Sequence, residues 1–234
     1  MRSVTEISSS LSANDRQTLA DLAAAPLWHS LVNDSGGCFA VVSEEGRVVF
    51  ANDVAGDVVQ CPASQMIGRV VDELLPPAIA KERMGFLRQV MQTGRPLIVD
   101  AVFMGMYRST VYRLHIGHAG AKYVLCAGRT GHMKPGVQLP PGMDYARTKH
   151  DDAGRFSALT ARELEILRMI GEGLTTAEIA KRLHRSVKTV EWDRVSLGTK
   201  LGVSNRVELA RIAIDSGLVS SNSVAAASEG TPED

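Results

Sequence analysis

Residues 156–219 read FSALTARELEILRMIGEGLTTAEIAKRLHRSVKTVEWDRVSLGTKLGVSNRVELARIAIDSGLV, and this stretch decides the fold of the C-terminal part of the chain. Capping residues and apolar residues at helical spacing predict four helices in it. The first opens at Thr160 with a Thr-x-x-Glu capping box. The second starts at Thr175 or Thr176, the third is capped by Ser186, and the fourth follows the Ser-Asn pair. The short turn between the second and third helices predicts a helix-turn-helix unit.

The third of these helices has a buried side and an outward side. Val190, Leu197 and Leu201 lie seven and four residues apart, which predicts a single buried seam. A base, an acid, an aromatic ring and short side chains turn away from that seam. The outward residues are Lys188, Glu191, Trp192, Val195 and Thr199. Such a mixture is suited to reading base edges in a major groove.

Other side chains of the stretch are suited to phosphate groups. Hydroxyl and cationic donors of this kind are Ser186, Lys188, Thr189, Arg194 and Lys200. Thr176 lies at the start of the second helix, where free amides and the helix dipole favour an anion. We therefore predict double-stranded DNA as the partner of this domain.

Residues 156–219 resemble the LuxR-type (NarL/FixJ-type) helix-turn-helix domain. The resemblance rests on five ordered motifs: Leu159-Thr160-x-Arg162-Glu163, Glu178-Ile179-Ala180, Ser186-Val187-Lys188-Thr189-Val190, Lys200-Leu201-Gly202-Val203 and Asn205-Arg206. It implies that the third helix enters the major groove and that the fourth helix makes a dimer contact. By position, Glu191, Trp192 and Val195 would face bases, and Ser186, Thr189 and Lys200 would hold phosphates.

The chain departs from that family after the Thr-Val pair. Members usually carry Lys or Glu, any residue and then His, whereas this chain has Glu191-Trp192-Asp193. A carboxylate near phosphate is repelled, so Asp193 would weaken DNA binding. Alternatively, Asp193 pairs with Arg194 or Lys188 and has no such effect.

The charge of the chain is zero overall but is unevenly distributed. Residues 155–219 carry eleven Lys and Arg against eight Asp and Glu, an excess of three positive charges. Residues 1–154 hold fifteen of each sign, and the tail after 219 is acidic. A modest positive excess confined to the helical stretch is consistent with a phosphate-binding surface.

The N-terminal part predicts an α+β domain. A helix is expected after Asn14 as its cap, and Pro26 is expected to end or kink it. The expected order then is two strands over 38–52, short helical material to about 73, a helix over 77–93, and strands over 96–106, 109–118 and 122–129. This order predicts a sheet with helices on one face.

Three short motifs make residues 38–130 resemble a PAS sensor domain. They are Glu45-Gly46-Arg47-Val48-Val49-Phe50-Ala51-Asn52, Met66-Ile67-Gly68-Arg69 and Gly94-Arg95-Pro96. The resemblance implies that this domain can bind a small-molecule ligand. It names no cofactor, because the cysteine of flavin-binding light sensors is absent after Gly68-Arg69 and helix 77–93 has no histidine for haem. His115 is predicted to point to solvent, and no metal ligand set is expected.

The expected organisation has five parts. They are an N-terminal helix over 1–37, a PAS-like sensor domain over 38–130, a linker over 131–155, an all-α four-helix LuxR-type helix-turn-helix domain over 156–219, and a disordered tail over 220–234. The linker has three prolines and four glycines, and the tail is small and polar. Three scattered cysteines and the lack of a signal sequence or long apolar run favour a cytoplasmic protein.

These patterns predict a one-component, dimeric DNA-binding transcription regulator whose PAS-like domain controls the helix-turn-helix. The alternative is a protein-interaction adaptor whose helix-turn-helix has weakened or lost DNA binding, with Asp193 as its only support. A phosphorylated response regulator would need an N-terminal acidic pair, a phosphoacceptor Asp after a strand and a late Lys, and the N-terminal half of this chain does not supply that order. An acyl-homoserine lactone receptor is disfavoured because Trp28 is the only tryptophan outside the helical domain. No enzyme motif is present in the sequence.

Overall fold

The computed structural model describes residues 11–131 and 139–219, which form two compact units. The first unit comprises residues 11–101, 109–129 and 139–151, and the second comprises 102–108, 130–131 and 152–219. The predicted tail over 220–234 and the start of the predicted N-terminal segment lie outside the described residues.

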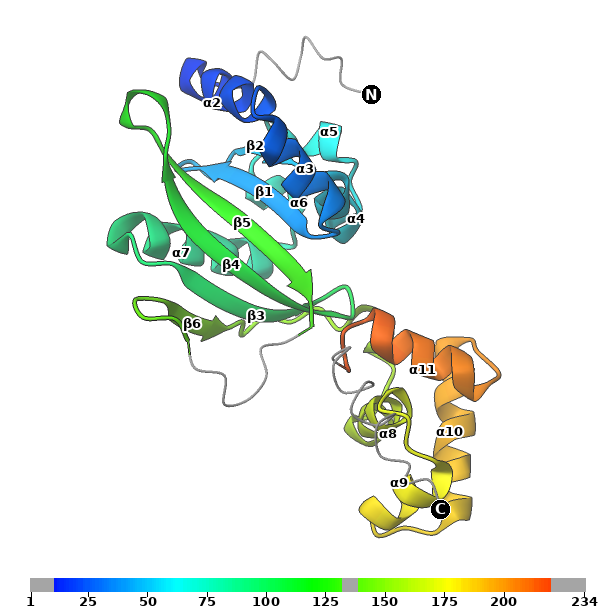
Figure 1. The fold of residues 1–234 in the computed structure, drawn as a ribbon. Helices are drawn as coiled ribbons and strands as arrows, with labels where there is room; N and C mark the ends of the chain where they lie inside the picture. The colour runs from blue at the N-terminus through cyan, green and yellow to red at the C-terminus, as the bar shows by residue number, and fades with distance from the viewer. Residues whose placement is uncertain (1–10, 132–138, 220–234) are drawn as a thin grey trace, which may run out of the picture. The chain divides into compact units, whose positions relative to one another are not determined.

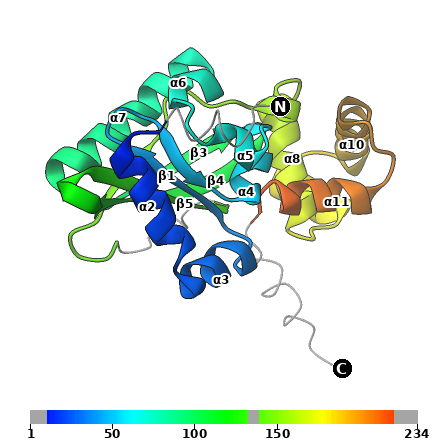
Figure 2. The ribbon, with the colours of Figure 1, turned by 90° about the horizontal axis from the view of Figure 1, so that it is seen from above.

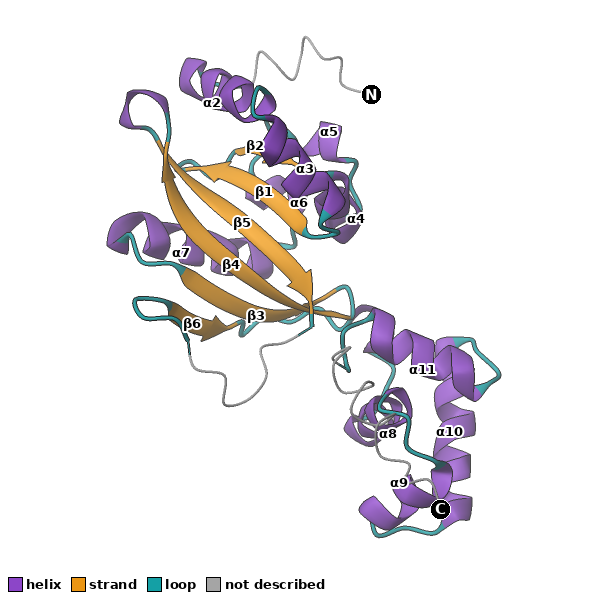
Figure 3. Cartoon of the chain, viewed as in Figure 1, coloured by secondary structure: helices purple, strands orange, loops and turns teal. Residues whose placement is uncertain are grey.

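The described residues form one six-stranded sheet in the order β2-β1-β5-β4-β3-β6 (Figure 3). Its strands are β1 (Cys38–Ser43), β2 (Val48–Ala51), β3 (Leu97–Phe103), β4 (Met106–Ile116), β5 (Lys122–Thr130) and β6 (Asp144–Arg147). β1 pairs antiparallel with both β2 and β5, whereas β6 runs parallel to β3.

Helices cover both faces of this sheet. The helices are α2 (Ala13–Ala23), α3 (Pro26–Asp34), α4 (Asp53–Val59), α5 (Ala63–Met66), α6 (Val71–Leu74) and α7 (Pro77–Thr93). α7 packs against the face that carries Val42, Tyr112 and Val124. Residues of α2 and α3 pack against the opposite face, which carries Val41 and Tyr123 (Figure 1).

The expectation of helices on one face was therefore wrong. Successive strand residues point to opposite faces, so the apolar residues on the second face also need a cover. Trp28 of α3 supplies part of it, with its ring edge-on to Phe39 and Phe50 at centroid distances of 6.5 and 5.6 Å. The first helix ends at Ala23, just before Pro26, as expected, and Pro26 then begins a second helix, since proline is well tolerated in the first turn of a helix.

The Asn that ends the Arg-Val-Val-Phe-Ala-Asn motif forms hydrogen bonds with four backbone groups. Asn52 Oδ1 accepts hydrogen bonds from the Phe39 and Ala55 amides at 3.0 Å each. Its Nδ2 donates to the carbonyls of Val32 and Gly37 at 2.9 and 2.8 Å. Asn52 is buried and all of these polar atoms are satisfied, so the side chain ties α3, β1 and α4 together.

The face of the sheet that α7 covers, here called the inner face, carries the Tyr112 hydroxyl and the Cys126 thiol among apolar side chains. Arg83 Nη1 lies 3.5 Å from the Tyr112 hydroxyl. Burial raises the pKa of Tyr112 to about 12 and that of the Cys126 thiol to about 12. Both groups are therefore neutral at physiological pH, and Cys126 has none of the thiolate character that a reactive cysteine needs. His115 is exposed, as predicted.

The predicted linker over 131–155 is partly ordered, and this is a correction. Strand β6 pairs with β3 from Leu97 opposite Asp144 to Asp100 opposite Arg147. Beyond β6, the Glu82 carboxylate of α7 accepts hydrogen bonds from the amides of Lys149 and His150 at 2.7 and 3.1 Å. Burial raises the pKa of Glu82, but these hydrogen bonds and His150 outweigh burial and the pKa is lowered.

The helical unit is built from α8 (Ala161–Gly171), α9 (Thr176–Arg182), α10 (Val187–Leu201) and α11 (Arg206–Asp215). Their apolar sides enclose one core that includes Ile166, Leu167, Ile179, Leu197 and Leu209. α11 lies against α8 (Figure 2), and α10 follows α9 after a short turn. The predicted four-helix domain is confirmed.

We predict that Glu82→Gln loosens the segment after β6. A neutral amide accepts weaker hydrogen bonds from Lys149 and His150, so exchange of these two amides with solvent deuterium should become about tenfold faster. Hydrogen exchange followed by mass spectrometry over residues 144–151 measures this. Glu73→Gln, at an exposed acid on α6, is the control and should leave exchange unchanged. Equal exchange in both variants would contradict the role of Glu82.

Candidate nucleic-acid interface

The helix-turn-helix is set by local backbone chemistry. Thr175 caps α9 through a reciprocal bond pair with Glu178. His184 adopts a left-handed conformation with φ 51°, which turns the chain sharply after α9. Ser186 then caps α10 by accepting a hydrogen bond from the Thr189 amide at 3.1 Å. The caps and the turn agree with the sequence prediction at each point.

Helix α10 buries one side and exposes the other. Val190 and Leu197 are fully buried, and Leu201 packs beside them. On the other side, Trp192 is 68% exposed and Val195 is 55% exposed. The five residues predicted to turn outward are all exposed: Lys188, Glu191, Trp192, Val195 and Thr199. Contact of this side with DNA stays a prediction.

A buried carboxylate from α8 holds the flank of α10 that carries Ser196 and Lys200. Glu163 is 5% exposed and accepts hydrogen bonds from Lys200 Nζ at 2.7 Å and Ser196 Oγ at 2.8 Å. It also accepts from the amide and hydroxyl of Thr160, at 2.8 and 2.9 Å. Burial raises the pKa of Glu163, but the bonds from Lys200, Thr160 and Ser196 outweigh it and lower the pKa to about 2. Glu163 therefore stays charged and binds α10 to the start of α8.

The sequence had assigned only a capping role to Glu163 and a phosphate role to Lys200. In the structure the ammonium group of Lys200 is held by Glu163, so its charge is already partly compensated. Ser196 was not predicted as a polar contact. The sequence shows only that a hydroxyl residue lies on a flank of the predicted helix. This does not identify Glu163 as its hydrogen-bond partner.

The remaining predicted phosphate residues lie around the turn and along α10. Thr176 is the first residue of α9 and is half-buried. The hydroxyls of Ser186 and Thr189 lie 2.8 Å apart at the exposed start of α10. Lys188 is exposed beside them. Arg194 is half-buried and lies on the side of the helix away from Lys200.

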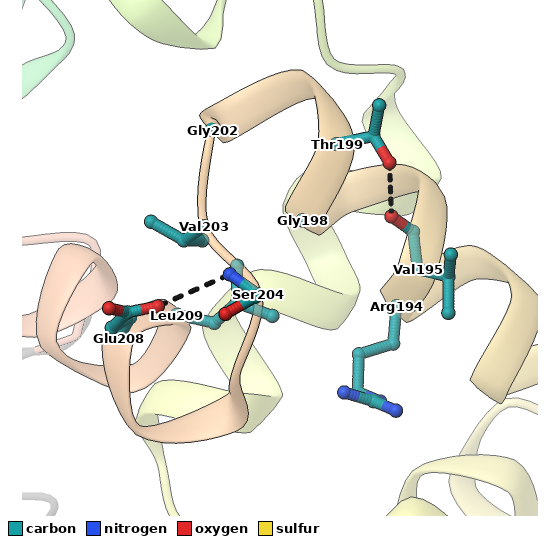
Figure 4. Close-up of a pocket in the computed structure, with 9 residues that line it drawn as sticks. All are labelled: Arg194, Val195, Gly198, Thr199, Gly202, Val203, Ser204, Glu208 and Leu209. Carbon is teal, nitrogen blue, oxygen red and sulfur yellow. Dashed lines mark hydrogen bonds between the residues drawn. The ribbon is translucent and has the colours of Figure 1, made fainter.

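A hollow of about 530 Å³ borders α10 near its end, and Arg194, Val195 and Thr199 line it on the α10 side (Figure 4). The opposite wall is the turn into α11, with Val203 and Ser204. The close approach of this turn requires Gly198, because a Cβ there would lie 2.7 Å from the Val203 carbonyl oxygen. The turn therefore sets the end of the outward face.

Asp193 does not share the outward face of Glu191 and Trp192. At about 100° per residue, it lies roughly 160° around the helix from Val195 and on the stripe of Thr189 and Lys200. It is half-buried, and in residues 11–131 and 139–219 it forms no ion pair. The predicted alternative, in which Asp193 pairs with Arg194 or Lys188, is therefore wrong.

No group of three or more His, Cys, Asp or Glu side chains in the described ranges could hold a metal ion. No helix within residues 11–131 and 139–219 is both long enough and apolar enough to cross a membrane.

Comparison with known proteins supplies two family matches. Residues 157–213 match the LuxR family of bacterial regulatory proteins, and residues 32–116 match the PAS fold. Both resemblances noted from the sequence are thus confirmed for these ranges. The matched C-terminal domain is one of regulatory proteins and not of enzymes.

Two individual relatives each match about a quarter of this chain. The transcriptional regulatory protein UhpA of Escherichia coli is 46% identical over 63 residues, which are 27% of this chain and 32% of that protein. The oxygen regulatory protein NreC of Staphylococcus aureus is 46% identical over 59 residues, 25% of this chain and 27% of that protein. The chain thus spans about a third or less of the length of these relatives. The solved VqmA dimer of Vibrio cholerae is 24% identical with a TM-score of 0.40, and the match covers 82% of this chain and 88% of that one.

We predict that Glu163→Gln destabilises the helical unit by about 2 kcal/mol at neutral pH, because a charged acceptor of buried hydrogen bonds is lost. The folded pKa of Glu163 lies below its unfolded value of 4.5, so its stabilising effect is complete above that value. It is lost as pH falls from about 4.5 towards about 2. Urea unfolding of wild type and variant across this range measures the effect. A difference that does not shrink on acidification would contradict it.

Proposed function

We propose that this chain, which carries a PAS fold followed by a LuxR-family domain, is a one-component transcription regulator that binds double-stranded DNA. One observation supports this most directly: α10 is capped, held by Glu163, and exposes Lys188, Glu191, Trp192 and Val195 on the side away from its core. A helix so presented can enter a major groove. As a DNA-binding protein, the chain would act in the cytoplasm.

We propose that the regulator acts as a homodimer. On α11, Val207 is 78% exposed and Ile214 is 37% exposed, so this helix offers an apolar side to a second copy. Leu27 and Leu31 are exposed one turn apart on α3, which offers a second apolar surface. A symmetric dimer would bind a pseudo-palindromic site with half-sites one helical turn apart.

We propose further that the PAS-like domain controls DNA binding through a small molecule. Such control requires a ligand whose affinity differs between the DNA-binding and non-binding states. Tyr112, on the face of the sheet that α7 covers, and Arg83 of α7 are two polar groups that could contact such a ligand. They favour a small ligand with a hydrogen-bonding group over a purely apolar one.

A salt titration tests DNA binding itself. We expect the full chain to bind a fluorescein-labelled mixed-sequence duplex. Its affinity should fall by about 10³-fold between about 50 mM and about 200 mM salt, because the protein's Lys and Arg release counterions from the phosphates and added salt opposes this release. Lys188→Ala should reduce the slope, whereas Lys122→Ala, at an exposed lysine of β5, should not. Fluorescence anisotropy measures both. A chain that binds no duplex at low salt would instead be a protein-interaction adaptor.

Asp193→His should raise DNA affinity. The carboxylate lies on the stripe of Thr189 and Lys200, where it would repel a phosphate, and its removal should gain about fivefold at low salt. The gain should shrink as salt screens the repulsion. Asp72→His, at an exposed acid on α6, is the matched control and should have no effect. Unchanged affinity of the Asp193→His variant would refute the repulsion.

A further inference from the structure

The outward side of α10 changes in chemistry along its length. Its later part carries Trp192 and Val195, two of the most exposed large apolar side chains in the described ranges. Thr199 follows, but its hydroxyl donates to the Val195 carbonyl at 3.0 Å (Figure 4). Its hydrogen is therefore used inside the helix. This part of the helix thus presents an indole ring and methyl groups to the outside.

The earlier part of the same side is charged. Glu191 and Lys188 are exposed about one turn before Val195 and Trp192, respectively. The next cation along the helix, Arg194, lies on the flank beside the hollow bordered by Gly198 and Glu208. The middle of the outward side therefore holds a carboxylate acceptor and apolar groups, and it lacks the forked cation that most often recognises guanine.

On the basis of the DNA-binding function proposed above, we infer that this chain selects thymine through its C5-methyl group, packed on Trp192 and Val195. The neighbouring base is a cytosine whose N4 amino group donates to Glu191. The major groove exposes both groups, and each marks its base pair uniquely there. Burial of a methyl group against exposed apolar side chains is favourable, because both surfaces leave water.

The target duplex is obtained first. The full chain selects sequences from a random duplex pool, and the enriched duplex is synthesised twice, once with thymine and once with deoxyuridine in its place. Deoxyuridine keeps every hydrogen-bonding group of thymine and lacks only the methyl. We expect the deoxyuridine duplex to bind about fourfold more weakly for each methyl that the protein buries.

Variants then assign the methyl contact to residues. Trp192→Ala and Val195→Ala should each bring the ratio of the two affinities towards one. Val207→Ala removes an even more exposed valine from α11 and should keep the wild-type ratio, whatever it does to overall affinity. All three positions are exposed, so the fold is retained, and circular dichroism checks this.

Glu191→Ala is tested by repeating the selection. We expect the enriched sequences to lose their preference for cytosine at one position in each half-site. An unchanged cytosine preference would overturn the role of Glu191.

The outcomes separate this inference from the proposed function. Tight binding of the thymine and deoxyuridine duplexes with equal affinity would overturn thymine selection and leave DNA binding intact. A pool that yields no enriched duplex, together with no binding at low salt, would overturn the function itself.

Discussion

The helical unit depends on one buried carboxylate. Glu163 caps its own helix at Thr160 and at the same time holds Lys200 and Ser196, more than thirty residues further along the chain. A buried charge is costly unless it is paired and fully hydrogen-bonded, and Glu163 is both. Helix α10 is therefore held on one flank by the ion pair and hydrogen bonds of Glu163, and along its buried side by Val190 and Leu197. The outward side takes no part in these contacts, so its residues can vary without loss of the fold.

The same division appears in the sheet unit. Asn52 satisfies four backbone groups from three elements, so the start of β1 and the start of α4 are fixed by hydrogen bonds. The face of the sheet that α7 covers is packed mainly by apolar side chains, and the Tyr112 hydroxyl on it meets Arg83 of α7. Rigid polar joints at the edges leave the interior chemistry open to change.

Local signals made most of the fold predictable, and distant contacts did not. The caps at Thr160, Ser186 and Asn205 act within three residues, so a capping pattern is enough to find them. The bond from Lys200 to Glu163 joins residues far apart, and neither residue alone signals it. Strand β6 was missed because Asp144–Arg147 has no apolar alternation and its partner strand lies more than forty residues earlier. The outward residues of α10 followed from helical periodicity, yet Asp193 was grouped with Glu191 and Trp192 because they adjoin in sequence.

The two tryptophans lie in different units and in different surroundings, which affects the fluorescence of the molecule. Trp28 lies in the sheet unit, half-buried against Phe39 and Phe50, and Trp192 lies in the helical unit, open to water. An indole in an apolar setting emits at shorter wavelength than one in water, so each unit contributes its own band to the emission of the intact chain. Stacking of nucleic acid on α10 would quench one band, and rearrangement around the sheet would shift the other. The two events can therefore be followed separately and without a label.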